Sequence, residues 1–173
     1  VMGLNNIELI TDRPLRTNLE EMTRVKKAWP DRALIASLMV PCVEESWKRI
    51  LPMVEDTGAD GLELNFGCPH GMSERGMGAA VGQVPEYIQM VTQWCKQYSR
   101  LPVIVKLTPN ITDIRVPAAA AQRGGADAVS LINTLNFIMG VDPATLTMSP
   151  ATAGFGSHGG YCGPAVKPIA LHM

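Results

Sequence analysis

Short apolar stretches alternate with longer amphipathic stretches along the chain. Runs rich in Val, Ile and Leu, bounded by Gly, Pro or Asn, predict strands at residues 6–10, 33–40, 61–65, 102–107 and 126–133. Between them, apolar residues recur with the period of a helix, which predicts helices at residues 18–29, 43–57, 85–98 and 112–124. The pattern therefore predicts strands that are each separated from the next by one helix.

This order of elements predicts a parallel sheet of the α/β class, because parallel strands need a crossover connection. The spacing of the strands fits either an open doubly wound sheet or part of a (β/α)8 barrel. Residues 134–159 interrupt the alternation with Pro, Gly, Ser and Thr, and predict a long loop of the kind that often carries function. With 173 residues, the chain is expected to form a single domain.

Charge and composition exclude several classes of partner. Fifteen basic and sixteen acidic residues give a net charge of −1, so neither nucleic acid nor an anionic membrane surface is expected as a partner. A content of 46% hydrophobic and 18% charged residues is typical of a folded, soluble protein. No apolar run approaches the roughly 18 residues that a membrane span needs.

The four cysteines, Cys42, Cys68, Cys95 and Cys162, form no Cys-x-x-Cys pair, and the chain has only three histidines. This spacing argues against a metal site, either zinc or an iron–sulfur cluster, and favours reduced thiols in the cytoplasm. The first residues lack the features of a secretory signal. A chain that opens inside a strand-like stretch is expected to be part of a longer protein.

Polar side chains stand at the ends of several predicted strands. Asn6, Asn65, Asn133 and Thr134 all have such positions, and the carboxyl ends of parallel strands converge on one crevice where α/β folds hold ligands. A single strand-end Asn is more often a turn or capping residue, so the prediction rests on several of them together. Lys106 lies among apolar residues of the fourth strand and must either reach solvent or meet an anion.

Cys68 opens a glycine-rich segment directly after the third strand. Five glycines from Gly67 to Gly82 predict a mobile loop that closes over a ligand. A thiol in such a loop can donate or accept a proton, and His70 is close enough in sequence to tune it; a cysteine without function is the alternative. Cys95, by contrast, lies on the apolar stripe of the third helix and is expected in the core.

A second glycine-rich segment, residues 158–164, precedes a short helix-like stretch. Backbone N–H groups at such a turn can cradle a phosphate, although glycine-rich turns are common and this signal is weak by itself. No G-x-G-x-x-G follows the first strand and no G-x-x-x-x-G-K-[ST] occurs, so the fingerprints of dinucleotide and nucleoside triphosphate sites are missing.

Taken together, these segments resemble the flavin-containing catalytic domain of the dihydropyrimidine dehydrogenases, in the form of the bacterial NAD-dependent pyrimidine-reducing subunit. The matching stretches are residues 6–10, 63–72, 74–78, 105–110, 133–134 and 159–171. The run CPHGM-x-ERGMG is specific to this enzyme type, whereas L-N-x-x-C-P is shared with the related dihydroorotate dehydrogenases. The likeness covers essentially the whole chain.

The resemblance implies a (β/α)8 barrel that holds FMN at the carboxyl ends of its strands, with about five of the β/α units in this chain. It assigns Cys68 to the cysteine that exchanges a proton with pyrimidine C5, Lys106 to the lysine beside the flavin, and Gly163 to a contact of the FMN phosphate. The pyrimidine-binding positions correspond to Asn6, Asn65, Asn133 and Thr134, with Phe66 and Gly67 beside the ring. At Gly67 many relatives have Ser.

The function implied by the resemblance is FMN-dependent reduction of uracil and thymine to 5,6-dihydropyrimidines. The electrons come ultimately from NADH through a partner subunit, with FAD and iron–sulfur clusters elsewhere in the complete enzyme, which is expected to be an oligomer. Two alternatives remain at this point: oxidation of dihydroorotate, and a non-catalytic barrel fragment.

Overall fold

The computed structural model describes residues 2–7, 11–68, 76–149, 151–152, 155–156 and 158–173. A four-stranded parallel sheet has the strand order β2-β3-β4-β5. Its strands are β2 (Ile35–Leu38), β3 (Gly61–Asn65), β4 (Val103–Lys106) and β5 (Ala128–Ser130). The helices between them are α2 (Glu44–Glu55), α3 (Ala79–Gly82), α4 (Pro85–Tyr98) and α5 (Arg115–Arg123). The predicted α/β class is confirmed, and β3 and α4 have the predicted bounds.

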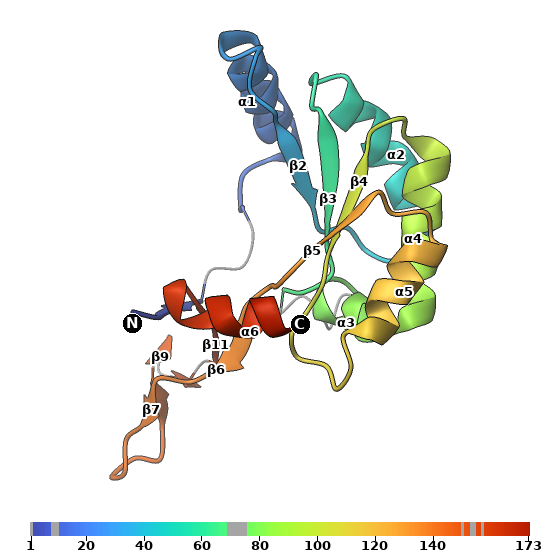
Figure 1. The fold of residues 1–173 in the computed structure, drawn as a ribbon. Helices are drawn as coiled ribbons and strands as arrows, with labels where there is room; N and C mark the ends of the chain where they lie inside the picture. The colour runs from blue at the N-terminus through green and yellow to red at the C-terminus, as the bar shows by residue number, and fades with distance from the viewer. Residues whose placement is uncertain (1, 8–10, 69–75, 150, 153–154, 157) are drawn as a thin grey trace.

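The two faces of this sheet differ in chemistry. One face carries Ala36, Leu62, Leu64, Val103 and Val105, each at most 4% exposed, and packs in one apolar core with side chains of α2, α4 and α5. Figure 1 shows these three helices along the same side of the sheet. Successive residues of a strand point to opposite faces, so the other face carries polar residues, namely Ser37, Glu63, Asn65, Lys106 and Ser130. This second face is called the open face below.

A separate antiparallel sheet joins the two ends of the chain. Its strands are β1 (Leu4–Asn6), β11 (Gly159–Cys162) and β6 (Leu135–Phe137), in the order β1-β11-β6. The prediction that a first strand at residues 6–10 belongs to the parallel sheet is therefore wrong at Asn6, which lies in β1; residues 8–10 lie outside the described residues. Pairing with β11, more than 150 positions away, is not visible in a local apolar pattern.

Residues 134–159, predicted as a loop, contain short strands. They hold β6, β7 (Gly140–Val141), β8 (Met148–Ser149), β9 (Ala151–Thr152) and β10 (Phe155–Gly156). β7 pairs with β8 and β9 with β10, and Figure 1 shows the β7 ribbon projecting away from the parallel sheet. Strands of two or three residues are too short to show an alternating pattern, which explains why the sequence predicted a loop.

The remaining helices are α1 (Leu15–Ala28), the 3-10 helix η2 (Pro164–Val166) and α6 (Lys167–His172). None of the residues of α1 is buried, although Lys26 Nζ ties the end of this helix to Asp60 Oδ2 at 2.8 Å. In the described part of the chain, no helix combines the length and the apolar character that a membrane crossing needs.

Candidate active site

The ends of β3 and β5 meet through two asparagine side chains. Asn65 is the last residue of β3, and Asn133 follows β5, held by a backbone hydrogen bond of 3.0 Å to Leu107 O. Asn133 Nδ2 donates to Asn65 Oδ1 at 2.9 Å, and the same oxygen accepts the backbone N–H of Gly67 at 3.2 Å. The structure thus brings together two of the predicted strand-end residues in one amide pair.

Lys106 lies on the open face and meets an anion from the neighbouring strand. Its Nζ donates to Glu63 Oε1 at 2.7 Å, with side-chain exposures of 24% for Lys106 and 21% for Glu63. Ser37 of β2 donates its hydroxyl to the same Glu63 oxygen at 2.8 Å. The sequence predicted that Lys106 either reaches solvent or meets an anion; the structure shows the second alternative, with Glu63 as the anion.

Thr134 is fixed between Asn133 and a residue that the sequence did not single out, Asn110. The backbone N–H of Thr134 donates to Asn133 Oδ1 at 2.8 Å, and its carbonyl accepts Asn110 Nδ2 at 3.1 Å. Asn110 Oδ1 in turn accepts the backbone N–H of Asn136 in β6 at 2.9 Å. Asn110 therefore connects the turn after β4 to the start of β6, and only the folded chain reveals this role.

Asn6 approaches Thr134 through the antiparallel sheet. It lies directly opposite Gly160 of β11, and a Cβ built on Gly160 would meet Thr134 Oγ1 at 2.0 Å. Directly opposite residues of an antiparallel pair project from the same face, so Asn6 projects from the face on which Thr134 lies. The glycine at position 160 thus leaves room between two residues that were predicted to share a site.

Cys68 follows β3 and is 6% exposed, and Phe66 is 2% exposed. The backbone of Cys68 is held by the start of α3, because Ala79 N–H donates to its carbonyl at 3.1 Å and Gly78, with φ of 58°, passes close to it. The predicted mobile loop is wrong for residues 79–82, which form α3. Residues 69–75, His70 among them, lie outside the described residues.

Gly67 lies against Asn133. A Cβ built on Gly67 would lie 2.4 Å from Asn133 Cβ and 2.8 Å from its Nδ2. Carbon atoms in proteins do not approach so closely, so a side chain at position 67 requires Asn133 to move. The glycine therefore permits the amide pair of Asn65 and Asn133.

Gly163 joins β11 to η2 with φ of 88°, a backbone conformation that favours glycine. The turn lies beside the N-terminal segment, since Ala165 N–H donates to Met2 O at 3.3 Å. The predicted glycine-rich turn before a helix is present. It lies at the end of the antiparallel sheet that also carries Asn6.

The other cysteines have different surroundings from Cys68. Cys95 is fully buried on α4, as predicted, and burial raises the pKa of its thiol to about 12. Cys42 is half-buried, and burial raises its pKa as well. All four cysteines are free thiols. Within the described ranges, no group of three or more His, Cys, Asp or Glu residues could hold a metal ion.

A model of the family described as dihydroorotate dehydrogenase matches residues 1–173. The chain belongs to this family. It is 48% identical over 171 residues to the chloroplastic dihydropyrimidine dehydrogenase (NADP(+)) of Arabidopsis thaliana. It is 42% identical over 172 residues to the NAD-dependent dihydropyrimidine dehydrogenase subunit PreA of Escherichia coli K12. Each match covers 99% of this chain. The resemblance inferred from the sequence motifs is therefore confirmed.

A dihydroorotate dehydrogenase is also similar to the chain. The catalytic subunit of dihydroorotate dehydrogenase B (NAD(+)) from Thermoanaerobacter sp. X514 is 41% identical over 144 residues, which is 83% of the chain. The chain spans 40%, 41% and 44% of the lengths of the Arabidopsis, Escherichia and Thermoanaerobacter proteins. Membership of the family thus extends over the whole chain, while more than half of each relative lies outside the match.

Proposed function

We propose that this chain carries the pyrimidine site of an FMN-dependent dihydropyrimidine dehydrogenase, which reduces uracil and thymine to 5,6-dihydropyrimidines. The observation that carries the proposal is the pair of Asn65 and Asn133, joined at 2.9 Å, in which Asn65 lies three residues before Cys68 and directly beside Lys106 in the register of β3 and β4. The two dihydropyrimidine dehydrogenases that match 99% of the chain support the same reaction.

The amide pair suits a neutral pyrimidine. Uracil presents alternating N–H donors and carbonyl acceptors, and an Asn amide offers one group of each kind. Asn65 Oδ1 already accepts from Asn133 and from Gly67, whereas within the described residues Asn65 Nδ2 has no acceptor. This amino group is therefore available to donate to a pyrimidine carbonyl. We place Thr134 and Asn6 at the same ligand, with Phe66 and Gly67 beside its ring.

The residues of the open face fit an FMN ring. A reduced flavin carries negative charge at its N1 and C2 carbonyl end, and Lys106 places an ammonium group, paired with Glu63, on the polar face that the helices leave uncovered. Gly163 supplies a turn at which a phosphate can meet backbone N–H groups. Bound FMN supplies the hydride for pyrimidine C6. Cys68 holds the proton that pyrimidine C5 receives, and its low exposure shields that proton from bulk water.

The alternative substrate, dihydroorotate, carries a carboxylate. On the strands of the open face, among the described residues, the cation is Lys106, and Glu63 neutralises it at 2.7 Å. A carboxylate on this face meets the Glu63 charge without a free cation to balance it. The face therefore favours uracil or thymine over dihydroorotate.

The wider assembly follows from the same proposal. Electrons reach the site from NADH through a partner subunit, with FAD and iron–sulfur clusters elsewhere in the complete enzyme. The Escherichia relative is named as a subunit, which supports a partner. An oligomeric state and a cytoplasmic location complete the proposal.

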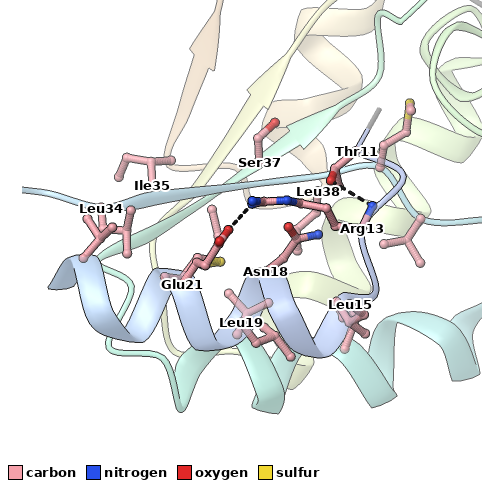
Figure 2. Close-up of a pocket in the computed structure, with 17 residues that line it drawn as sticks. Thr11, Arg13, Leu15, Asn18, Leu19, Glu21, Leu34, Ile35, Ser37 and Leu38 are labelled. Carbon is pink, nitrogen blue, oxygen red and sulfur yellow. Dashed lines mark hydrogen bonds and ion pairs between the residues drawn. The ribbon is translucent and has the colours of Figure 1, made fainter. Parts of the chain in front are cut away.

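The domain itself is proposed to be an incomplete barrel. β2 is an edge strand of the parallel sheet, and a cavity of about 540 Å³ separates it from α1 (Figure 2). Apolar residues of α1 line this cavity, namely Leu15, Leu19, Met22 and Val25. Arg13 forms an ion pair with Glu21 across it. Among the described residues, the outer edge of β2 has no partner strand and faces an apolar cavity, which suits one more parallel strand; we place this strand in the segment that precedes residue 1 in a longer protein.

Two measurements on the purified protein test the proposed function. The flavin absorbance spectrum shows whether FMN binds, and anaerobic reoxidation of the reduced flavin by uracil or by orotate identifies the substrate. We expect bound FMN and reoxidation by uracil. Reoxidation by orotate but not by uracil contradicts the proposal in favour of dihydroorotate oxidation, and a protein that takes up no flavin contradicts it in favour of a non-catalytic domain.

A further inference from the structure

We infer that Glu63 is a positioning residue, which fixes the ammonium group of Lys106 and sets the net charge that the open face presents. This inference rests on the proposed function for its flavin readout only. It starts from a three-strand arrangement in which Ser37 of β2, Glu63 of β3 and Lys106 of β4 are joined through one carboxylate oxygen.

The geometry gives that oxygen two donors. Glu63 Oε1 accepts the Ser37 hydroxyl at 2.8 Å and the Lys106 ammonium at 2.7 Å. Ser37 lies directly beside Glu63 in the register of β2 and β3, so its hydroxyl orients the carboxylate from the side opposite to Lys106. A carboxylate held in this way confines the flexible lysine side chain to one direction.

Stability alone does not account for the arrangement. The three strands are already paired through their backbones, and Lys106 and Glu63 retain 24% and 21% of their side-chain exposure. Partly exposed ion pairs contribute little to the free energy of unfolding. What the pair does change is charge, because Glu63 turns the cation on the open face into a neutral pair.

The net charge of this pair affects the reduction potential of a nearby flavin. A full positive charge beside a reduced flavin stabilises the anionic form, and a neutral pair stabilises it less. Glu63→Gln keeps an oxygen that accepts from Lys106 but removes the negative charge. The variant is therefore expected to raise the reduction potential of bound FMN, whereas Lys106→Met is expected to lower it.

A flavin-free measurement tests the positioning role directly. The full chain is acetylated with acetic anhydride, and the rate at each lysine is followed by mass spectrometry. Glu63→Gln replaces the charge-assisted hydrogen bond that confines the Lys106 amine with a weaker one to a neutral amide oxygen, so acetylation of Lys106 is expected to be about tenfold faster. Lys96, which pairs with Asp127 at 2.8 Å, is the internal reference and should not change. Ser37→Ala leaves the charge in place and should give a smaller increase.

Glu55 offers a matched control because it has the same kinds of partner as Glu63. It accepts the hydroxyl of Ser99 at 2.6 Å and faces Arg100 at 3.4 Å, at the C-terminal ends of α2 and α4. Glu55→Gln should change neither Lys106 acetylation nor the flavin potential. An unchanged Lys106 rate in Glu63→Gln overturns the positioning role whether or not flavin binds. An unchanged reduction potential in FMN-loaded Glu63→Gln protein overturns the charge effect. A protein that takes up no FMN refutes the proposed function, and the acetylation result then decides the role of Glu63.

Discussion

Asn133 and Asn65 are 68 positions apart in the sequence and share a hydrogen bond of 2.9 Å between their side-chain amides. The backbone N–H of Gly67 donates to the same Asn65 oxygen at 3.2 Å, so the orientation of the Asn65 amide is determined by its donors. Among the described residues, the amino group of Asn65 has no acceptor and is left for a ligand. This hydrogen bond joins the end of β3 to the segment after β5, and it leaves an amide donor that can meet a pyrimidine carbonyl.

Replacing Asn133 by Ala should weaken pyrimidine binding without removing the flavin. The change removes one amide and frees the other, and a lost hydrogen bond of this kind costs about 1 to 3 kcal/mol, a factor of about 5 to 150 in affinity. Uracil binding can be followed through the change in flavin absorbance. Asn136→Ala is the control, since Asn136 is exposed and contributes its backbone N–H to Asn110. Unaltered uracil affinity in a folded Asn133→Ala protein removes Asn133 from the site.

Gly67→Ala should weaken uracil binding because the new side chain displaces Asn133. A Cβ at position 67 would lie 2.4 Å from Asn133 Cβ, so Asn133 must leave its position and the amide pair breaks. We expect a loss of uracil affinity similar to that of Asn133→Ala, and little further loss in the double variant. Gly140→Ala, where a Cβ meets nothing within 4 Å, is the matched control. Additive losses in the double variant would show that the two residues act independently.

The parallel sheet was predictable from sequence because its signals are local. β3 begins and ends as predicted, since Gly61 and Asn65 bound a run of alternating residues, and α4 carries a clear apolar stripe. Cys95 was correctly placed in the core for the same reason. The pairing of β1 with β11 in the antiparallel sheet instead joins residues more than 150 positions apart, such as Asn6 and Gly160, and no local pattern encodes it.

The candidate site was likewise predictable from the sequence only in part. Strand-end positions identified Asn65, Lys106 and Asn133 as polar residues at one edge, because the alternation along each strand fixes the face of its side chains. The sequence did not show which of these side chains contact one another. The partner of Lys106 was one of several polar residues on that face, and the registers of β2, β3 and β4 select Glu63.

The 173-residue chain is expected to bind FMN more weakly than a longer protein that includes the segment before residue 1. Among the described residues, no strand pairs with the outer edge of β2, the cavity beside α1 is open, and we assign only Gly163 to the phosphate. Fluorescence titration of FMN compares the two proteins. Leu19→Arg, in the cavity lining, should weaken binding in the longer protein and have little effect in the chain. Equal FMN affinity in the two proteins means that the barrel does not continue upstream.

The proposed proton donor makes the most direct prediction. Cys68→Ala should keep the flavin and bind pyrimidine, because the thiol contributes little volume, yet lose at least about a hundredfold in turnover, the usual scale for general acid–base catalysis. Cys68→Ser should retain a little activity, since a hydroxyl transfers a proton but is a much weaker acid than a thiol.

Cys95→Ala is the internal control for this experiment, because Cys95 is also a buried cysteine but lies in the core formed with α4. Its loss leaves a small cavity and should lower the free energy of unfolding without specifically slowing the reaction. Stopped-flow measurement of flavin reoxidation by uracil compares the three variants with the unaltered protein. If Cys68→Ala reoxidises as fast as the unaltered protein, the proton at C5 comes from another group, and the low exposure of Cys68 then reflects its close approach to Gly78 rather than catalysis.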